Sequence, residues 1–147
     1  MQVKKVIIAS DHAGCPLKEA IINHLKEQDI TVFNYGTNDE NTSVDYPDYA
    51  VKVVRGIVHG EAQYGILICG TGIGISIAAN KVKGIRAALC HDCFSAKATR
   101  EHNNANVLAM GGRIIGAGHA LDVVDLFLDT PFSNDPRHIR RIQGIEG

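Results

Sequence analysis

The sequence lacks the cysteine content, the long apolar runs and the charge imbalance that mark several classes of protein. Its 147 residues include only four cysteines, too few for a disulfide scaffold. No apolar run approaches the roughly 18 residues of a membrane span. Lys and Arg number 15 against 16 for Asp and Glu, a formal net charge of −1. We therefore expect no nucleic-acid partner and no membrane partner.

The amino-terminal residues do not resemble a secretion signal. The stretch MQVKKVIIASDH has a four-residue apolar run before polar residues resume, which is shorter than the core of a signal peptide. We therefore expect a cytoplasmic protein with reduced thiols. No linker, low-complexity run or internal repeat divides the chain, so we expect a single domain over residues 1–147.

Apolar runs alternate along the chain with segments of helical periodicity. The alternation predicts five strands, at residues 4–10, 30–34, 64–69, 85–90 and 105–111. It also predicts five helices, at residues 15–28, at 50–59, directly after residue 74, from about residue 92, and at 119–128. Strict alternation requires crossover connections between parallel strands, so the pattern predicts a doubly wound α/β sandwich.

Three loops are expected at the carboxyl edge of this sheet, where ligands bind in open α/β folds. SDHAG (10–14) follows the first strand, CGTGIG (69–74) the third, and GGR (111–113) the fifth. The glycines of CGTGIG allow close backbone approach, and its N–H groups with the following helix N-terminus favour a negative oxygen. Residues 36–48 form a long polar loop, a kind that is often functional.

Familiar anion-binding loops do not match CGTGIG. A Walker loop requires Lys and then Ser or Thr where this sequence has Ile75 and Ser76. The dinucleotide fingerprint GxGxxG does not match because the glycines are spaced GxGxG. That fingerprint is usually followed about twenty residues later by an acidic residue, and Asp92 stands at about that distance, so dinucleotide binding stays open as an alternative. A cysteine phosphatase of the low-molecular-weight kind would need Arg in place of Ile75.

Five stretches together resemble one known family. They are SDHAG, VDYPDYA (44–50), ICGTGIGISIAANK, REHNNANVLAMGGR (100–113) and RHIRR (137–141). In this order they are similar to the ribose-5-phosphate isomerase B family, which includes galactose-6-phosphate isomerase subunits and allose-6-phosphate isomerases. The resemblance spans nearly the whole chain and implies aldose–ketose interconversion of sugar phosphates. It also implies a single-domain, Rossmann-like three-layer α/β/α sandwich with a five-stranded parallel sheet, and no metal or organic cofactor.

Such a reaction needs a base for a carbon-bound proton, and the resemblance assigns this role to Cys69. Helix N-termini and positive charge favour a thiolate, so the chemistry permits the assignment. N–H groups of residues 70–74 would stabilise the enediolate. Some family members carry a glutamate base at the position of Ile75, which strengthens the case for Cys69 here.

The resemblance assigns ring opening to His102, assisted by Asp11 and Thr71. It implies the following substrate-binding residues: Asp11, His12, Tyr46, Gly70, Thr71, Gly72, Ile73, Gly74, Asn103, Arg113, Arg137 and Arg141. Arg137 and Arg141 would share one face of a helix in a carboxyl-terminal tail at about residues 131–147, and their guanidinium groups suit phosphate geometry.

The resemblance also implies a homodimer, or a tetramer, with active sites shared between subunits. It assigns His102, Asn103 and Arg113 to one subunit, and we expect Cys69, Arg137 and Arg141 to come from the other. Within this family, the presence of Cys69 favours ribose 5-phosphate as the substrate. Six-carbon substrates, allose 6-phosphate or galactose 6-phosphate, remain the alternative because pocket depth cannot be predicted from one chain.

Each candidate residue also has a structural interpretation. Buried cysteine often acts as a small hydrophobe, which would explain Cys69 without catalysis. His102 would suit the carboxyl end of a helix, and Asp11 and Asp92 would suit helix N-caps. Arg140 is interpreted as a solvated charge.

Two functions of other classes stay open. Cys90 and Cys93 form a CxxC motif at a predicted strand-to-helix turn, a pattern typical of thiol redox proteins, but a second CxxC for a zinc site is absent. The other alternative is a sugar-phosphate binder without catalysis. It is disfavoured because the cysteine, the histidine and all three matched arginines are present.

Overall fold

The computed structural model describes residue 3 and residues 5–147. The described residues form five strands: β1 (Lys5–Ser10), β2 (Thr31–Asn34), β3 (Tyr64–Cys69), β4 (Ala87–Leu89) and β5 (Val107–Gly111). They also form six α-helices: α1 (Cys15–Glu27), α2 (Tyr46–Val58), α3 (Ile73–Ala79), α4 (Cys93–Ala98), α5 (Ala117–Asp129) and α6 (Pro136–Glu146). A 3-10 turn, η1 (His12–Gly14), precedes α1, and a π-helical turn, η2 (Thr99–Asn103), extends α4.

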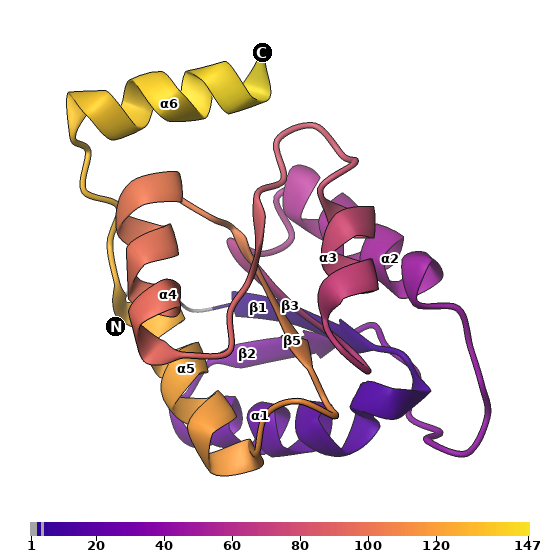
Figure 1. Cartoon of the computed structure of the whole chain (residues 1–147). Helices are drawn as coiled ribbons and strands as arrows, with labels where there is room; N and C mark the ends of the chain where they lie inside the picture. The colour runs from indigo at the N-terminus through magenta and orange to yellow at the C-terminus, as the bar shows by residue number, and fades with distance from the viewer. Residues whose placement is uncertain (1–2, 4) are drawn as a thin grey trace.

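The five strands form one parallel sheet in the order β2-β1-β3-β5-β4. Helices cover both faces, with α2 and α3 on one side and α1, α4 and α5 on the other (Figure 1). Every residue of the central strand β3 is buried, as expected for an apolar run between two helical layers. The predicted three-layer α/β/α sandwich is therefore confirmed.

Each helical layer has its own apolar core against the sheet. On one face, Ile21 and Leu25 of α1 pack with Val124 and Phe127 of α5 in one buried cluster. On the other face, Val53 of α2 belongs to a second buried cluster with residues of α3. Two buried layers hold the sheet rigid, so the loops at its edges have a fixed platform.

Several predicted boundaries differ from the structure. Helix α2 begins at Tyr46, four residues before the predicted start at 50, because Pro47 suits the first helical turn. Strand β4 covers only Ala87–Leu89 of the predicted 85–90. Lys4, the first residue of the predicted first strand, lies outside the described residues. No helix among the described residues is long and apolar enough to cross a membrane.

The two helix N-caps expected at aspartates are present. Asp11 accepts the N–H groups of Ala13 and Gly14 at 3.0 and 3.3 Å, which starts η1. Asp92 accepts the N–H of Ser95 at 2.7 Å and starts α4. The caps fix where the chain turns away from the carboxyl ends of β1 and β4.

The tail helix α6 lies apart from the sandwich. Figure 1 shows it in yellow, standing off from the sheet at the end from which β5 begins. The helix confirms the prediction that the carboxyl-terminal tail is helical. It contributes no buried residue, so contacts made by individual side chains must hold it in place.

Candidate active site

The loop after β3 surrounds the sulfur of Cys69. Cys69 is buried at the carboxyl end of β3, and its Sγ accepts the N–H of Gly72 at 3.2 Å. The N–H of Ile73 bonds the Thr71 Oγ1 at 3.2 Å. Two of the loop amides therefore hold the sulfur and Thr71 in this structure, and the predicted contact of residues 70–74 with a substrate oxygen stays a prediction. A donated N–H stabilises the thiolate form of a cysteine, which suits a base.

Two glycines in this loop are required by its geometry. Gly72 has φ 78°, in the left-handed region, and a Cβ there would lie 2.6 Å from the carbonyl carbon of Met110. A Cβ on Gly74 would overlap the phenol ring of Tyr46, which packs directly on this glycine. Tyr46, the first residue of α2, therefore lies over the loop that follows Cys69, and its predicted role in substrate binding stays a prediction.

Residues after β1 form the neighbouring wall of the site. Between β1 and β3 the sheet changes winding direction, and ligands bind at such switch points. His12 Nδ1 accepts the N–H of Val44 at 3.2 Å. A neutral imidazole that accepts at Nδ1 carries its proton on Nε2, so His12 has a donor left for a substrate oxygen. Asp11 is buried and engaged in its cap.

Arg113 lies against the same loop. Its backbone N–H donates to the carbonyl of Gly70 at 3.0 Å. Its guanidinium packs against Gly70, because a Cβ added to this glycine would lie 3.4 Å from Arg113 Nη1. Among the described residues, no carboxylate lies within ion-pair distance of Arg113. The guanidinium therefore places a positive charge beside Cys69.

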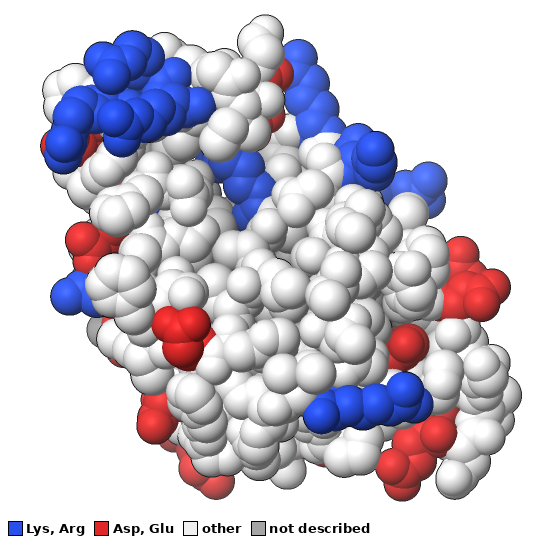
Figure 2. Space-filling view, in the orientation of Figure 1, with Lys and Arg blue, Asp and Glu red and all other residues white. Residues whose placement is uncertain are grey.

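A second group of expected site residues lies near the start of β5. A cavity of about 440 Å³ is lined by His102, Asn103, Arg137, His138, Arg141, Ile142 and Ile145. The rings of His102 and His138 lie 4.5 Å apart between centroids. Figure 2 shows Lys and Arg gathered over α6 beside this cavity. The cavity combines two imidazoles with a positive helix face, which suits an anionic ligand.

Arg137 is held in place by a carboxylate of its own helix cap. Its Nη2 lies 3.1 Å from Asp135 Oδ2, and its Nε lies 3.2 Å from Oδ1. The hydrogen bonds from Arg137 lower the pKa of Asp135 to about 2 and raise the pKa of Arg137. Asp135 orients this guanidinium and would compete with phosphate for part of its charge.

The two groups lie at opposite edges of the sheet. Cys69 aligns with Gly111 at the carboxyl end of β5, whereas η2 leads into Val107 at the amino end. Val107 and Gly111 are four residue steps apart along β5, a distance of about 13 Å at 3.3 Å per residue. One chain therefore does not bring Cys69 and His102 together.

This arrangement corrects the predicted division between subunits. Arg113 was expected with His102, but it lies beside the Cys69 loop. Arg137 and Arg141 were expected with Cys69, but they line the His102 cavity. The reason is topological: residues 111–113 follow the carboxyl end of β5, while α6 returns to the amino edge of the sheet.

The first cysteine of the CxxC motif is poorly suited to thiol redox chemistry. Cys90 is buried, and burial with the nearby Asp92 carboxylate raises the pKa of its thiol to about 11. A thiol with so high a pKa is a poor nucleophile near neutral pH. Among the described residues, no three His, Cys, Asp or Glu side chains gather as a metal site.

Two histidines were missed as site residues by the sequence analysis. His138 lines the His102 cavity, and its place within RHIRR beside Arg137 was the available signal. His91 Nε2 accepts the N–H of Gly111 at 2.8 Å, so it supports the loop that carries Arg113. Burial lowers the pKa of His91, which keeps it a neutral acceptor. No sequence pattern indicates that contact.

Comparisons with known proteins show the family to which this chain belongs. The family model described as Ribose/Galactose Isomerase matches residues 6–145. The crystal structure of a ribose 5-phosphate isomerase from Thermotoga maritima is 54% identical, with a TM-score of 0.95 and 99% of each chain covered. Ribose-5-phosphate isomerase B from Escherichia coli (strain K12) is 45% identical over 97% of this chain and 95% of its own.

A relative named for a different substrate also matches. D-erythrulose-4-phosphate isomerase from Pectobacterium atrosepticum is 43% identical over 86% of this chain and 84% of its own. The family match covers nearly the whole sequence, including both groups of site residues. This chain therefore belongs to the ribose/galactose isomerase family and is a sugar-phosphate isomerase.

Proposed function

We propose that the protein interconverts ribose 5-phosphate and ribulose 5-phosphate through an enediolate, with Cys69 as the base. The observation that carries the proposal is the N–H of Gly72 directed at the buried Cys69 Sγ. A thiolate stabilised in this way can take the proton from the carbon next to the carbonyl. The positive charge of Arg113 beside the loop favours both the thiolate and the enediolate.

Ring opening is assigned to His102 of a second subunit. The separation of Cys69 and His102 within one chain supports this assignment, because a single site needs both groups within reach of one sugar. Asn103, next to His102, would bond the sugar hydroxyls. A homodimer in which each carboxyl edge meets the partner's amino edge would build two complete sites.

An exposed apolar surface around the Cys69 loop supports the same assembly. Phe94 is 81% exposed and Ile114 58% exposed, and both follow the carboxyl ends of strands. Ile73 and Ile77 of α3, the helix that follows the Cys69 loop, are about half exposed. Figure 2 shows that the centre of the face in view is largely free of charged side chains. Exposed apolar side chains grouped in this way are typical of protein interfaces.

Phosphate binding is assigned to the arginines of both edges. Arg137 and Arg141 line the cavity of His102 and would enter the partner's site with it. Arg113 and His12 would approach from the Cys69 side. Guanidinium groups bind phosphate through paired, charge-assisted hydrogen bonds.

The alternative substrate is a sugar phosphate of another length. The family description includes galactose, and the Pectobacterium relative is named for D-erythrulose 4-phosphate. Ribose 5-phosphate is favoured because it is the substrate named for the Escherichia coli and Thermotoga relatives.

A direct substrate comparison tests the proposal. The purified protein is assayed without added metal on ribose 5-phosphate, allose 6-phosphate, galactose 6-phosphate and D-erythrulose 4-phosphate. We expect the highest kcat/KM for ribose 5-phosphate, together with exchange of its carbon-2 proton with solvent. A higher kcat/KM for another of the four would replace the proposed substrate, and isomerisation without any exchange would rule out the enediolate.

A further inference from the structure

The tail helix α6 has separate attachments at its two ends. At its amino end, Ser133 donates its N–H to the Glu101 carbonyl at 3.3 Å, and the His138 ring lies against His102. At its carboxyl end, Glu146 accepts the N–H of Gly84 at 3.2 Å and a hydrogen bond from Arg86 at 2.7 Å. Because no α6 residue is buried, these few polar contacts determine where the helix lies.

Arg86 links the tail to the turn that carries the ring-opening histidine. Its Nη1 donates to Glu146 Oε1 at 2.7 Å, its Nε to the carbonyl of Asn103 at 2.8 Å, and its Nη2 to the carbonyl of Asn104 at 3.0 Å. One planar guanidinium therefore bonds three acceptors from two separate segments. Asn104 has φ 46°, and this left-handed turn ends η2 just after His102 and Asn103.

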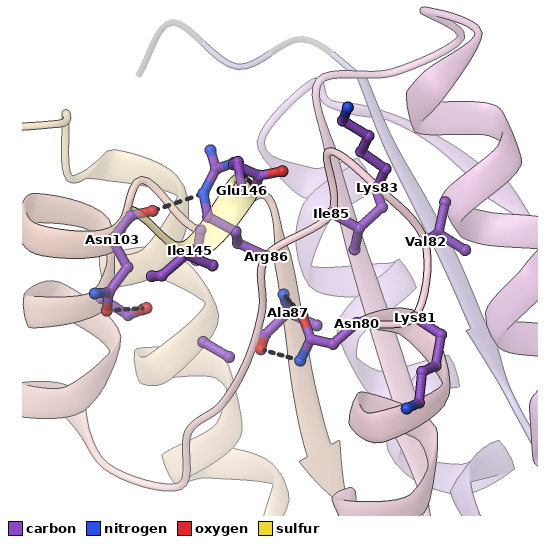
Figure 3. A pocket seen from close by; sticks show the side chains of 13 residues that line it. Asn80, Lys81, Val82, Lys83, Ile85, Arg86, Ala87, Asn103, Ile145 and Glu146 are labelled. Atoms are coloured by element: carbon purple, nitrogen blue, oxygen red, sulfur yellow. Dashed lines mark hydrogen bonds and ion pairs between the residues drawn. The ribbon is translucent and has the colours of Figure 1, made fainter. Parts of the chain in front are cut away.

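The link borders a second cavity next to that of His102. Figure 3 shows Arg86 among the residues that line this cavity of about 650 Å³, with Asn103 on one side of its guanidinium and Glu146 of the tail on the other. Asn103 and Ile145 line both cavities, so the two adjoin along the tail. The Arg86–Glu146 ion pair is mostly shielded from solvent, with 18% and 27% of the two side chains exposed. The hydrogen bond from Arg86 also lowers the pKa of Glu146.

We propose that Arg86 is a positioning residue for the substrate phosphate. By bonding Glu146 and the carbonyls of Asn103 and Asn104 together, it fixes α6 against η2, and so sets where Arg137 and Arg141 meet a phosphate. Arg86 does not itself touch the substrate. The inference rests on the proposed phosphate-binding role of Arg137 and Arg141.

Glu146→Gln tests the link without disturbing the turn. Arg86 keeps both carbonyl acceptors, so the fold should persist, but the tail loses its charged partner. We expect KM for ribose 5-phosphate to rise about threefold, with kcat changed by less than about twofold, because a mostly shielded ion pair is lost. Competitive inhibition by inorganic phosphate should weaken by the same factor. Amide hydrogen exchange of residues 136–146 should accelerate, while exchange in β3 should not change.

A double-mutant cycle separates the link from general damage. Arg86→Gln should raise KM by at least as much as Glu146→Gln, and the double variant should match Arg86→Gln alone, since Arg86→Gln already removes the bond to Glu146. Glu61→Gln is the matched control, because this carboxylate bonds Tyr35 far from the tail. The control should leave KM, phosphate inhibition and tail exchange unchanged.

The outcomes distinguish this inference from the proposed function. Additive effects of Arg86→Gln and Glu146→Gln, or unchanged phosphate inhibition in folded Glu146→Gln, would overturn the link. Should ribose 5-phosphate not be the substrate, phosphate inhibition of the true substrate's turnover tests the link equally well. If alanine at both Arg137 and Arg141 leaves phosphate inhibition unchanged, the proposed phosphate site fails and this inference fails with it.

Discussion

At the scale of single residues, Cys69 differs from Cys15 and Cys90 in what its sulfur contacts. The Cys69 Sγ accepts an N–H from Gly72, which stabilises a thiolate. The Cys15 Sγ instead donates to the carbonyl of Thr37 at 3.3 Å and accepts a hydrogen bond from the Ser10 hydroxyl at 4.0 Å, and no backbone N–H of the described residues is directed at it. Cys90 is buried with a raised pKa. Of these three, Cys69 is the one suited to accept a proton.

Replacing Cys69 with alanine should therefore abolish proton transfer and spare binding. We expect isomerisation to fall by a factor on the order of 10² to 10⁴, the usual cost of removing a general base. Exchange of the carbon-2 proton should fall equally, whereas phosphate affinity should stay near that of the unmodified protein. Cys15→Ala is the matched control and should keep its activity once folding is verified. Substantial proton exchange in Cys69→Ala would exclude this residue as the base.

Cys90 should make the stability of the protein depend on alkaline pH. Its pKa is raised from 9.0 to about 11, so the unfolded chain ionises first as pH rises. The contribution of this thiol to stability is complete below pH 9 and is lost between pH 9 and about 11. We expect a loss of about 2 kcal/mol in this window. Urea unfolding with reductant at pH 7 and pH 10.5 should show this loss relative to Cys90→Val, and equal pH dependence in both proteins would contradict it.

At the scale of elements, the sequence predicts the strands and helices more accurately than it predicts the turns. β1 and β3 are buried apolar runs bounded by Asp and Gly, so local pattern alone indicates them. The π-helical turn η2 was not predicted, because it depends on Arg100. That guanidinium is buried and bonds the carbonyls of Thr130 and Ala105, contacts that only the folded chain creates.

Site residues were predicted through the family motifs, but their grouping was not. Arg113 and Arg137 were both expected to bind phosphate, and the sequence does not indicate at which edge of the sheet each one lies. That depends on the direction of β5 and on the position of α6 at the amino edge. The Arg86 link was also invisible, because it joins residues 60 positions apart through one side chain. Local sequence patterns indicate elements, whereas contacts between distant segments require the topology.

The loop after β3 gives a test at this scale. Gly72→Ala should destabilise the protein by about 2 kcal/mol or more, since alanine resists the left-handed conformation and its methyl group would meet Met110 and Leu89. Gly118→Ala is the control, because nothing lies within 4 Å of a Cβ there and its φ is ordinary. Alanine at this helical position should be neutral or stabilising by up to about 1 kcal/mol. Equal thermal midpoints for the two variants would contradict the strained geometry of Gly72.

At the scale of the whole molecule, the residues proposed for catalysis fall into two groups at opposite ends of the parallel strands. The carboxyl edge holds Cys69 with Arg113, and the amino edge holds His102 with the tail arginines. Under the proposed shared site, neither group is complete in one chain. In an antiparallel dimer, the carboxyl edge of each subunit would meet the amino edge of the other, which would form two sites. Assembly is thus central to the proposed activity.

Complementation between two inactive variants tests this central claim most directly. Cys69→Ala and His102→Ala proteins are mixed in equal amounts, and native mass spectrometry confirms subunit exchange. Each heterodimer should contain one site with both lesions and one site with neither. Random exchange makes about half of the dimers mixed, so we expect about a quarter of the activity of the unmodified protein. Confirmed heterodimers without recovered activity would contradict the shared site.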